Sequence, residues 1–402
     1  MRRPDANTRI AITGLGIICS IGRNQTEVWD SIVATRAGIA PLRRFPHDTF
    51  PTDLAAEAEL AVSLPAREAR RLSRTDLLAV VAAQEAIAQA GTVPLERAIV
   101  STGTSTGGLL EGEDYYMRRS TIGRRRARAS RVLQQPTSSP SDAVARVLGL
   151  GGGAVSNATA CASAGAAIGM AADYLRSGHA DVAIAGGSDA LCRLTYSGFN
   201  VLQAVDPEPC SPFGATRKGI TLGEGAGYLV LERWDDAVAR GATILAELAG
   251  YGASCDAHHP TAPAEDGSGA EAAMRGAMSE AGLEAASVDY VNAHGTGTLL
   301  NDSAETKAII SALGTNVPVS SSKSYFGHTL GASGAVEAVV TVLALQHQIA
   351  PPTLRLDERA DDCPLDYIPH TPRAMAMTNV LSNTFGFGGS NVSLAFRRVL
   401  TL

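Results

Sequence analysis

A polar, extended stretch of the chain turns into an Ala- and Gly-rich helical run within Asn157-Ala158-Thr159-Ala160-Cys161-Ala162-Ser163-Ala164-Gly165. Cys161 therefore stands at a predicted helix N-terminus, where unpaired N–H groups and the helix dipole favour thiolate over thiol. A nucleophilic cysteine requires that environment. A small buried cysteine at a tight corner would produce the same local pattern, so other segments must decide between these interpretations.

Two histidines occupy comparable positions after strand-like segments. His294 lies in Asn292-Ala293-His294-Gly295-Thr296-Gly297-Thr298, directly after an apolar run. His328 lies in Ser321-Ser322-Lys323-Ser324-Tyr325-Phe326-Gly327-His328-Thr329-Leu330-Gly331-Ala332, which also follows a strand-like run and leads into a helix. A histidine at a strand end, beside glycines that allow close backbone approach, can face a cavity. Either histidine alone could equally be an ordinary core or loop residue.

The chain divides into two similar halves, 1–235 and 236–402. Each opens with a strand-like segment, Arg9–Ile17 in the first and 242–251 in the second, and then alternates helical and strand-like segments. Each half also carries a Gly- and Ala-rich helix after a turn. This alternation predicts helices packed on mixed sheets. No low-complexity linker separates the halves, so we expect one compact unit.

Composition indicates a water-soluble enzyme with a large core. The chain has 402 residues, of which 45% are hydrophobic and 18% charged, and its net charge of −6 argues against a general nucleic-acid binder. Six cysteines show neither metal-ligand spacing nor a disulfide framework, which favours the reducing cytoplasm and predicts no metal site. The most apolar helical stretch, 338–345, is too short for a membrane span.

These segments together resemble the β-ketoacyl-[acyl-carrier-protein] synthases of the type I/II branch, condensing enzymes of fatty-acid and polyketide synthesis in the thiolase-like superfamily. The resemblance runs from Ile12-Thr13-Gly14-Leu15-Gly16 to Asn383-Thr384-Phe385-Gly386-Phe387-Gly388-Gly389-Ser390-Asn391. The cysteine block, the two histidine blocks and the Gly-Phe-Gly-Gly block follow the family's order. Related branches have Asn or Cys in place of one histidine, so the Cys-His-His set indicates the decarboxylating, carrier-dependent branch.

The resemblance implies an α/β, thiolase-like fold: two stacked βαβαβαββ units in five αβαβα layers, with the active site between the halves. It implies that Cys161 takes an acyl group from a phosphopantetheine thioester and that malonyl then loses carbon dioxide to give the attacking enolate. His294 and His328 would donate N–H bonds to the enolate oxygen. The N–H groups of Cys161 and Phe387 would form the oxyanion hole. No cofactor is implied beyond the carrier's own phosphopantetheine.

A supporting set follows from the same match: Lys323, Glu337, Asp302 and Glu305. Glu337 lies on an otherwise apolar helix, where an unpaired carboxylate is costly, so we expect a partner such as Lys323. Asp302 and Glu305 lie one helical turn apart and could equally form a helix-start cap. We expect their role to be structural more than chemical.

Two residues match positions of the family's acyl pocket. Thr106 lies in Gly103-Thr104-Ser105-Thr106-Gly107-Gly108-Leu109, and Phe199 lies in Tyr196-Ser197-Gly198-Phe199. Plain core packing is the alternative for both. His259 follows His258 near Cys255, a grouping that suits the pocket mouth better than a metal site.

Arginines gather in two clusters of an otherwise acidic chain, and carrier proteins are typically acidic, so we expect these clusters to steer docking. A solvated helix face is the alternative. The predicted carrier-binding residues are Arg67, Arg70, Arg71, Arg124, Arg125 and Arg126.

Departures from the common pattern indicate a specialised pathway. Gly214, Lys218 and Ile220 stand where primary fatty-acid enzymes typically have Asp, Asp and Phe. With Asp189-Ala190-Leu191-Cys192-Arg193-Leu194-Thr195, they resemble ketosynthases of type II polyene pathways, which often pair with a ketosynthase-like chain-length subunit. We therefore expect a homodimer or such a heterodimer. The alternatives are a primary fatty-acid elongating synthase, a non-catalytic chain-length subunit, or an acyltransferase that uses coenzyme A directly.

Overall fold

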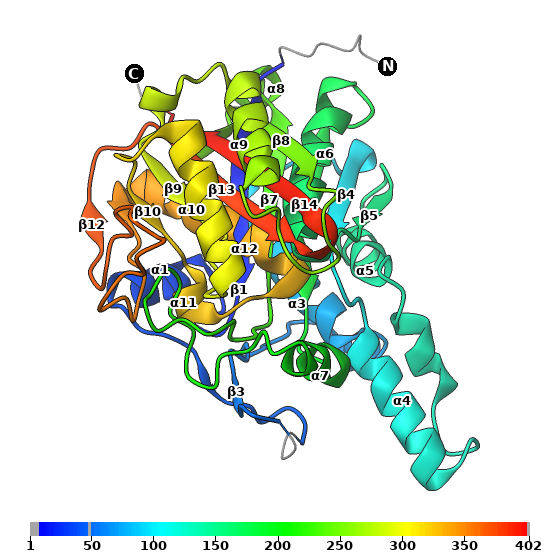
Figure 1. Ribbon diagram of the computed structural model, residues 1–402. Coiled ribbons are helices and arrows are strands. Elements are labelled where there is room, and N and C mark those ends of the chain that lie inside the picture. Colours follow the sequence, from blue (N-terminus) through cyan, green and yellow to red (C-terminus); the bar gives the residue numbers. More distant parts are fainter. Residues whose placement is uncertain (1–7, 47–49, 400–402) are drawn as a thin grey trace.

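The computed structural model describes residues 8–46 and 50–399 (Figure 1). Within them, ten strands hydrogen-bond into one mixed sheet, in the order β10-β9-β13-β14-β8-β1-β7-β6-β4-β5. The first half supplies β1 (Ile10–Ile18), β4 (Ala98–Gly103), β5 (Ala154–Asn157), β6 (Val182–Asp189) and β7 (Gly225–Arg233). The second half supplies β8 (Ala246–Cys255), β9 (Tyr290–Asn292), β10 (Val319–Ser320), β13 (Asn379–Gly386) and β14 (Ser390–Arg397). Two small sheets pair β2 (Ala40–Pro41) with β3 (Leu54–Ala55), and β11 (Ile349–Ala350) with β12 (Arg373–Ala374).

The order of the strands shows the internal duplication. Numbered within its own half, each set of five runs 3-2-4-5-1 from the outer edge toward the middle. The two sets join where β1 pairs antiparallel with β8, from Ile10 opposite Leu248 to Ile12 opposite Ala246. The two predicted units are therefore continuous through one sheet. The division at residues 235 and 236 stays a prediction.

Helices form three layers around the two parts of the sheet (Figure 1). α6 (Ser163–Arg176) and α12 (Ser333–His347) pack against each other and contact strands of both halves. α3 (Arg74–Ala90) covers the outer face of β1 and β7, and α9 (Ser268–Ala281) covers that of β8 and β14. The arrangement gives the five αβαβα layers expected, with α6 and α12 in the middle.

The other helices lie at the margins of these layers. Among the described residues they are α1 (Gln25–Val33), α2 (Ala66–Ala69), α4 (Leu109–Ile122), α5 (Ser139–Leu148), α7 (Arg193–Val201), α8 (Trp234–Ala239), α10 (Leu299–Leu313) and α11 (Lys323–Phe326). α4 projects from the body of the molecule at the lower right of Figure 1. Short 3₁₀ turns precede the two central helices, η3 (Ala160–Ala162) before α6 and η5 (Leu330–Ala332) before α12.

The central helix α12 is apolar enough to be compared with a membrane-spanning helix. Together with η5 it gives an 18-residue segment, Leu330–His347, that is long and apolar enough to cross a membrane. The apolar stretch 338–345 lies within this longer segment. However, 89% of this segment is buried inside the protein, as in a core helix, so it offers lipid almost no free surface.

Candidate active site

Cys161 lies in η3, the tight turn between β5 and α6. Ala160 adopts a positive φ of 50°, and its carbonyl accepts a hydrogen bond from the Ser163 hydroxyl at 2.5 Å. A non-glycine residue in this region is strained, and surrounding contacts must hold it. The turn places Cys161 at the start of α6, as predicted, with 6% of its surface exposed.

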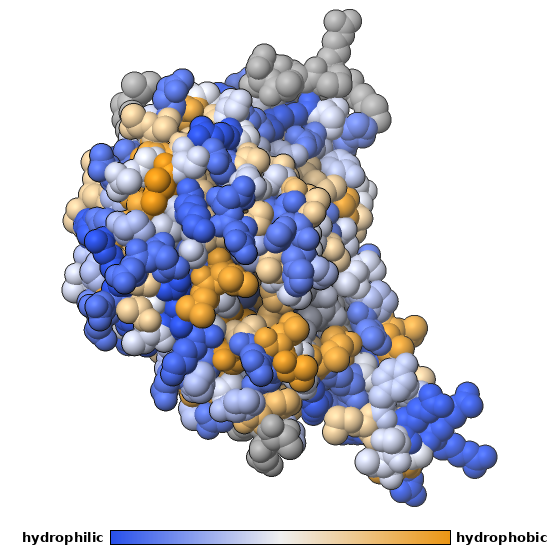
Figure 2. All heavy atoms as spheres, in the orientation of Figure 1, coloured by the Kyte–Doolittle hydropathy of each residue, from blue (hydrophilic) through white to orange (hydrophobic). Residues whose placement is uncertain are grey.

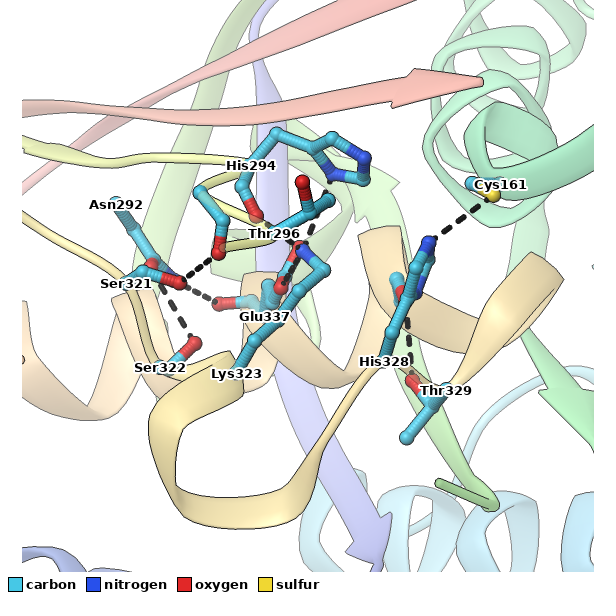
Figure 3. Close-up of polar contacts among 12 residues, drawn as sticks. Cys161, Asn292, His294, Thr296, Ser321, Ser322, Lys323, His328, Thr329 and Glu337 are labelled. Atoms are coloured by element: carbon cyan, nitrogen blue, oxygen red, sulfur yellow. Dashed lines mark hydrogen bonds and ion pairs between the residues drawn. The ribbon is translucent and has the colours of Figure 1, made fainter. Parts of the chain in front are cut away.

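The structure brings the predicted nucleophile and the two histidines together from three distant segments. Nε2 of His328 lies 3.1 Å from Sγ of Cys161, and the His294 and His328 ring centroids lie 5.3 Å apart at 84°. Figure 3 shows His328 directed at Cys161, with His294 beside it. All three side chains line one cavity of about 400 Å³.

Lys323 fixes the orientation of His294. Its ammonium group lies 3.1 Å from Nδ1 of His294, donates to the His294 carbonyl at 2.6 Å, and pairs with Glu337 (Figure 3). An ammonium group only donates, so Nδ1 accepts and the proton of the neutral imidazole sits on Nε2. Lys323 and Glu337 are both fully buried, and the expected pairing is present. Burial raises the pKa of Glu337 to about 7, against the lowering effect of Lys323.

A parallel arrangement fixes His328. The backbone N–H of Leu330 donates to its Nδ1 at 3.2 Å, and the Ser333 hydroxyl lies 2.9 Å from the same atom. Nδ1 is therefore an acceptor, and the proton sits on Nε2, toward Cys161. Burial, followed by the charge of Lys323, holds the pKa of both His294 and His328 well below the usual value. The cavity thus contains two neutral imidazoles that each present an N–H.

The expectation that the helix N-terminus favours the thiolate of Cys161 is outweighed by burial. Burial raises the pKa of its thiol to about 12, and Asp189 and Glu337 add to this effect. Lys323 and the backbone N–H of Phe387 act in the opposite direction but do not outweigh burial. The sequence predicted the helix N-terminus at Cys161 but not the burial of its thiol.

The oxyanion hole predicted at Cys161 and Phe387 has a geometric basis. The N–H of Phe387 hydrogen-bonds to the Cys161 sulfur. Phe387 opens a turn in which Gly388 and Gly389 have φ of 83° and 78°, a backbone that favours glycine. Gly386 packs so tightly that a Cβ there would lie 3.0 Å from the Cys161 nitrogen. The two N–H groups therefore lie close together beside the thiol.

Asp302 and Glu305 hold the loop that carries His294. Glu305 accepts the N–H groups of His294 and Gly295, both at 2.8 Å, and Asp302 accepts that of Thr296 at 3.0 Å. Both carboxylates are buried, and burial raises the pKa of Glu305 to about 7. The alternative of a helix-start cap is not realised, because the Thr298 hydroxyl caps α10.

The two predicted pocket residues lie in different surroundings. Phe199 lines the cavity, and its ring lies 5.5 Å from that of Phe387. Thr106 is not among the residues that line it; its hydroxyl donates to Asp189 at 2.7 Å. Sequence reasoning missed Asp189 as a site residue. His259 lines the cavity, and no group of three or more potential metal ligands occurs in the described part of the chain.

The predicted carrier-binding arginines are exposed and lie outside this cavity. Arg70 and Arg71 line a second hollow of about 720 Å³, together with Arg128, Arg131 and Arg146. Arg67 lies on α2. Arg124, Arg125 and Arg126 follow the end of α4, whose projecting end is strongly hydrophilic in Figure 2. The hollow thus contains Arg70 and Arg71 but none of the three arginines Arg124, Arg125 and Arg126.

Comparisons with known proteins agree with this site. Family models match at residues 7–237 (β-ketoacyl synthase, N-terminal domain) and 245–357 (β-ketoacyl synthase, C-terminal domain). Nodulation protein E from Rhizobium meliloti is 40% identical, over 97% of this chain and 99% of that protein. The 3-oxoacyl-[acyl-carrier-protein] synthase 2 from a Synechocystis strain is also 40% identical, over 97% of this chain and 98% of that one. The solved structure of the ishigamide ketosynthase/chain length factor matches with a TM-score of 0.92 and 34% identity, covering 98% and 100%.

This chain belongs to the β-ketoacyl synthase family. Its fold is the thiolase-like fold that the sequence resemblance implied, and its class is that of acyltransferases that build carbon chains by condensation.

Proposed function

We propose that this chain is a catalytically active β-ketoacyl synthase that acylates Cys161 from a carrier-bound thioester and then extends the acyl group with malonyl units. The observation that carries the proposal is the 3.1 Å contact between Cys161 Sγ and His328 Nε2, in the cavity that also contains His294. A nucleophile and two neutral N–H donors facing one space suit an acyl transfer followed by enolate chemistry.

In the first step the Cys161 sulfur bonds to the acyl carbonyl carbon, and the bond from that carbon to the pantetheine sulfur breaks. The thiol proton ends on the released pantetheine. The N–H groups of Cys161 and Phe387 are positioned to bind the oxyanion of the tetrahedral intermediate, as fixed donors in a buried site. The Nε2–H of His328 donates a hydrogen bond to the Cys161 sulfur while negative charge develops there.

In the second step malonyl loses carbon dioxide, and the electron pair of the broken C–C bond remains as an enolate. The enolate carbon bonds to the acyl carbonyl carbon, and Cys161 leaves as a thiolate that takes a proton from solvent. No strong base is needed, because decarboxylation supplies the carbanion. Nε2–H of His294 and of His328 are the donors for the enolate oxygen, and each donor of this kind is worth about 2.7–4 kcal/mol.

The test separates the two steps. His294→Ala and His328→Ala variants are assayed for acylation of Cys161 by intact mass and for release of carbon dioxide from malonyl carrier. We expect decarboxylation to fall roughly 100-fold or more, with acylation less affected. Equal loss of both half-reactions would exclude the proposed role of the enolate donors.

The non-catalytic chain-length subunit is the main rival, since the matched ishigamide structure contains a chain length factor. In such subunits the nucleophile is commonly replaced, whereas here Cys161, Lys323, His294 and His328 are all present and in contact. A primary fatty-acid synthase is the second alternative. The departures at Gly214, Lys218 and Ile220 favour a specialised type II polyketide pathway of the polyene kind.

The proposed partner is an acidic acyl carrier protein in the cytoplasm. Five arginines line one hollow, beside two carboxylates, Asp76 and Asp142: Arg70, Arg71, Arg128, Arg131 and Arg146. A surface with this excess of cations steers an acidic partner. Apolar side chains also gather over the start of α10 and over α7 (Figure 2), and Leu202, Leu299 and Leu300 line the cavity mouth. We further propose a dimer, either with a second copy or with a chain-length subunit.

A further inference from the structure

Asp189 is a fully buried carboxylate at the end of β6, and it does not line the active-site cavity. No described cation forms an ion pair with it. It accepts five hydrogen bonds instead: from Thr104 Oγ1 (2.6 Å), Ser105 N (2.8 Å), Thr106 N (2.9 Å), Thr106 Oγ1 (2.7 Å) and Gly331 N (2.7 Å). The donors come from two segments that are far apart in the chain. Because all of them bond to one buried carboxylate, the carboxylate fixes the two segments relative to each other.

Each of the two segments is connected to one of the reacting groups. The hydroxyl of Ser105 donates to the carbonyl of Ala160 at 3.0 Å, and Ala160 is the strained residue directly before Cys161. On the other side, Gly331 follows Leu330, whose N–H fixes the ring of His328. Asp189 is therefore linked to Cys161 through Ser105 and Ala160, and to His328 through Gly331 and Leu330.

The internal duplication shows what Asp189 replaces. Gly331 is the counterpart of Cys161: each is the middle residue of a 3₁₀ turn, after a residue with φ near 50°, at the start of a central helix. At Cys161 the adjoining strand ends in Gly386, which has no side chain that could accept a hydrogen bond from the Cys161 N–H. At Gly331 the equivalent strand ends in Asp189, whose carboxylate accepts the hydrogen bond of the Gly331 N–H.

Close packing makes this second turn rigid. A Cβ at Gly331 would lie 2.5 Å from Ser105 N and 2.7 Å from the Asp189 carboxylate, so the Gly331 turn and the Ser105 loop are in direct backbone contact. Movement of the 104–106 loop would displace both η3 and η5. The two hydroxyl groups, of Thr104 and Thr106, anchor the loop to the carboxylate.

We propose that Asp189 is a positioning residue for acyl transfer, acting on Cys161 through Ser105 and on His328 through Gly331. The inference rests on the proposed acylation of Cys161. It also assigns the Thr106 hydroxyl a role that an aliphatic residue at this position could not fill: it holds the loop through Asp189. Burial is the main cause of the raised pKa of the Cys161 thiol, and the negative charge of Asp189 adds to it, which gives a readout that a purely structural role would not move.

The experiment compares Asp189→Asn with Glu85→Gln. Glu85 is the control, because it is a partly buried carboxylate that accepts backbone N–H groups, those of Ile17 and Gln25, but forms no hydrogen bond with the active-site segments. Acylation of Cys161 by acyl carrier is followed by intact mass, and alkylation of Cys161 by iodoacetamide is followed as a function of pH. Alkylation needs no acyl substrate, so a wild-type protein that alkylates but never acylates would refute the proposed function itself.

For Asp189→Asn we expect acylation to fall roughly 100-fold, the loss typical of a misplacement of about 1 Å. The alkylation profile should move to lower pH, since one of the two carboxylate charges that add to the raised Cys161 pKa is gone. Glu85→Gln should change neither. Asp189→Asn acylating as fast as Glu85→Gln would overturn the proposal.

A second pair of variants avoids a change in the buried carboxylate. Thr106→Val keeps the shape of the side chain and removes the hydroxyl, and we expect acylation to fall about tenfold, the worth of one good hydrogen bond. Thr106→Ser restores the hydroxyl and should recover most of that loss. If Thr106→Val and Thr106→Ser acylated at the same rate, the contact with Asp189 would have no part in positioning.

Discussion

The ammonium group of Lys323 lies 3.1 Å from Nδ1 of His294, and through this contact a buried ion pair sets the tautomer of an imidazole in the cavity. Because Lys323 can only donate, His294 must present its proton on Nε2. Lys323 is paired with Glu337, and both side chains are fully buried. One buried cation thereby serves both the stability of the fold and the direction of a hydrogen-bond donor.

The first prediction concerns this pair. Lys323→Met removes the group that fixes His294 and leaves Glu337 buried without a partner, which costs about 3–5 kcal/mol of unfolding free energy. We expect decarboxylation of malonyl carrier to fall roughly 100-fold, as for loss of one oriented donor. Urea unfolding and carbon dioxide release measure the two effects.

A double variant separates stability from chemistry. Lys323→Met combined with Glu337→Leu removes both charges, so we expect the unfolding free energy to recover by several kcal/mol, on the order seen when buried ion pairs become apolar. Decarboxylation should stay low, because His294 still lacks its lysine. Recovery of decarboxylation in the double variant would show that Lys323 acts only by neutralising Glu337.

The second prediction is a pH dependence of stability. Burial holds the pKa of His294 well below the usual value, so below pH 6.5 the unfolded chain binds a proton that the folded chain does not. Stability therefore falls as the pH drops, by about 1.4 kcal/mol per pH unit for one such histidine. His294→Gln should lose less stability than the wild type between pH 6.5 and pH 5.

The comparison with the wild type is needed because two carboxylates act the other way. Burial raises the pKa of Glu305 and of Glu337 to about 7, so between about pH 4.5 and 7 the folded chain holds protons that the unfolded chain releases. These groups stabilise the fold as the pH falls, and they are present in both proteins. Parallel curves of unfolding free energy against pH would show that His294 is protonated in the folded state.

Much of this site could be predicted because local sequence carried the signals. The strand-to-turn positions of Cys161, His294 and His328 and the match to a known family predicted that they meet. The cost of a carboxylate on an apolar helix predicted the partner of Glu337. Asp189 gave no such signal, since its five donors come from segments that only the folded sheet brings together. The thiolate expectation was outweighed for a related reason: burial of Cys161 is a tertiary property.

The third prediction concerns Phe199, whose ring lines the cavity beside Phe387. Phe199→Ala enlarges the cavity, and we expect the ratio of long-chain to acetyl acylation of Cys161 to rise about tenfold, the range of discrimination that apolar pockets achieve. Intact mass across a ladder of acyl carriers measures it. Val201→Ala, at an 80% exposed position of the same helix, is the control. If Phe199→Ala acylated Cys161 with the same chain-length profile as the wild type, the Phe199 ring would not contact the acyl chain.

The fourth prediction concerns the carrier. Arg70→Glu with Arg71→Glu reverses two charges of the arginine-lined hollow, and Arg124→Glu with Arg125→Glu reverses two beyond α4. We expect each pair to raise the KM for acyl carrier and to flatten its dependence on salt, because steering by exposed charges is screened by ions. Acyl-pantetheine, which lacks the protein, should react as before. A pair that leaves the carrier KM unchanged at low salt does not contribute to docking.

The most direct test of the account is the mass of Cys161 itself through one reaction cycle. The wild-type protein is mixed with acyl carrier, its intact mass and the modified peptide are recorded, and malonyl carrier is then added. We predict that the acyl mass appears on Cys161, disappears when malonyl carrier is added, and reappears on the carrier as the β-ketoacyl product, and that folded Cys161→Ala shows none of these changes. Elongation by Cys161→Ala, or a wild-type Cys161 that is never acylated, would contradict the account.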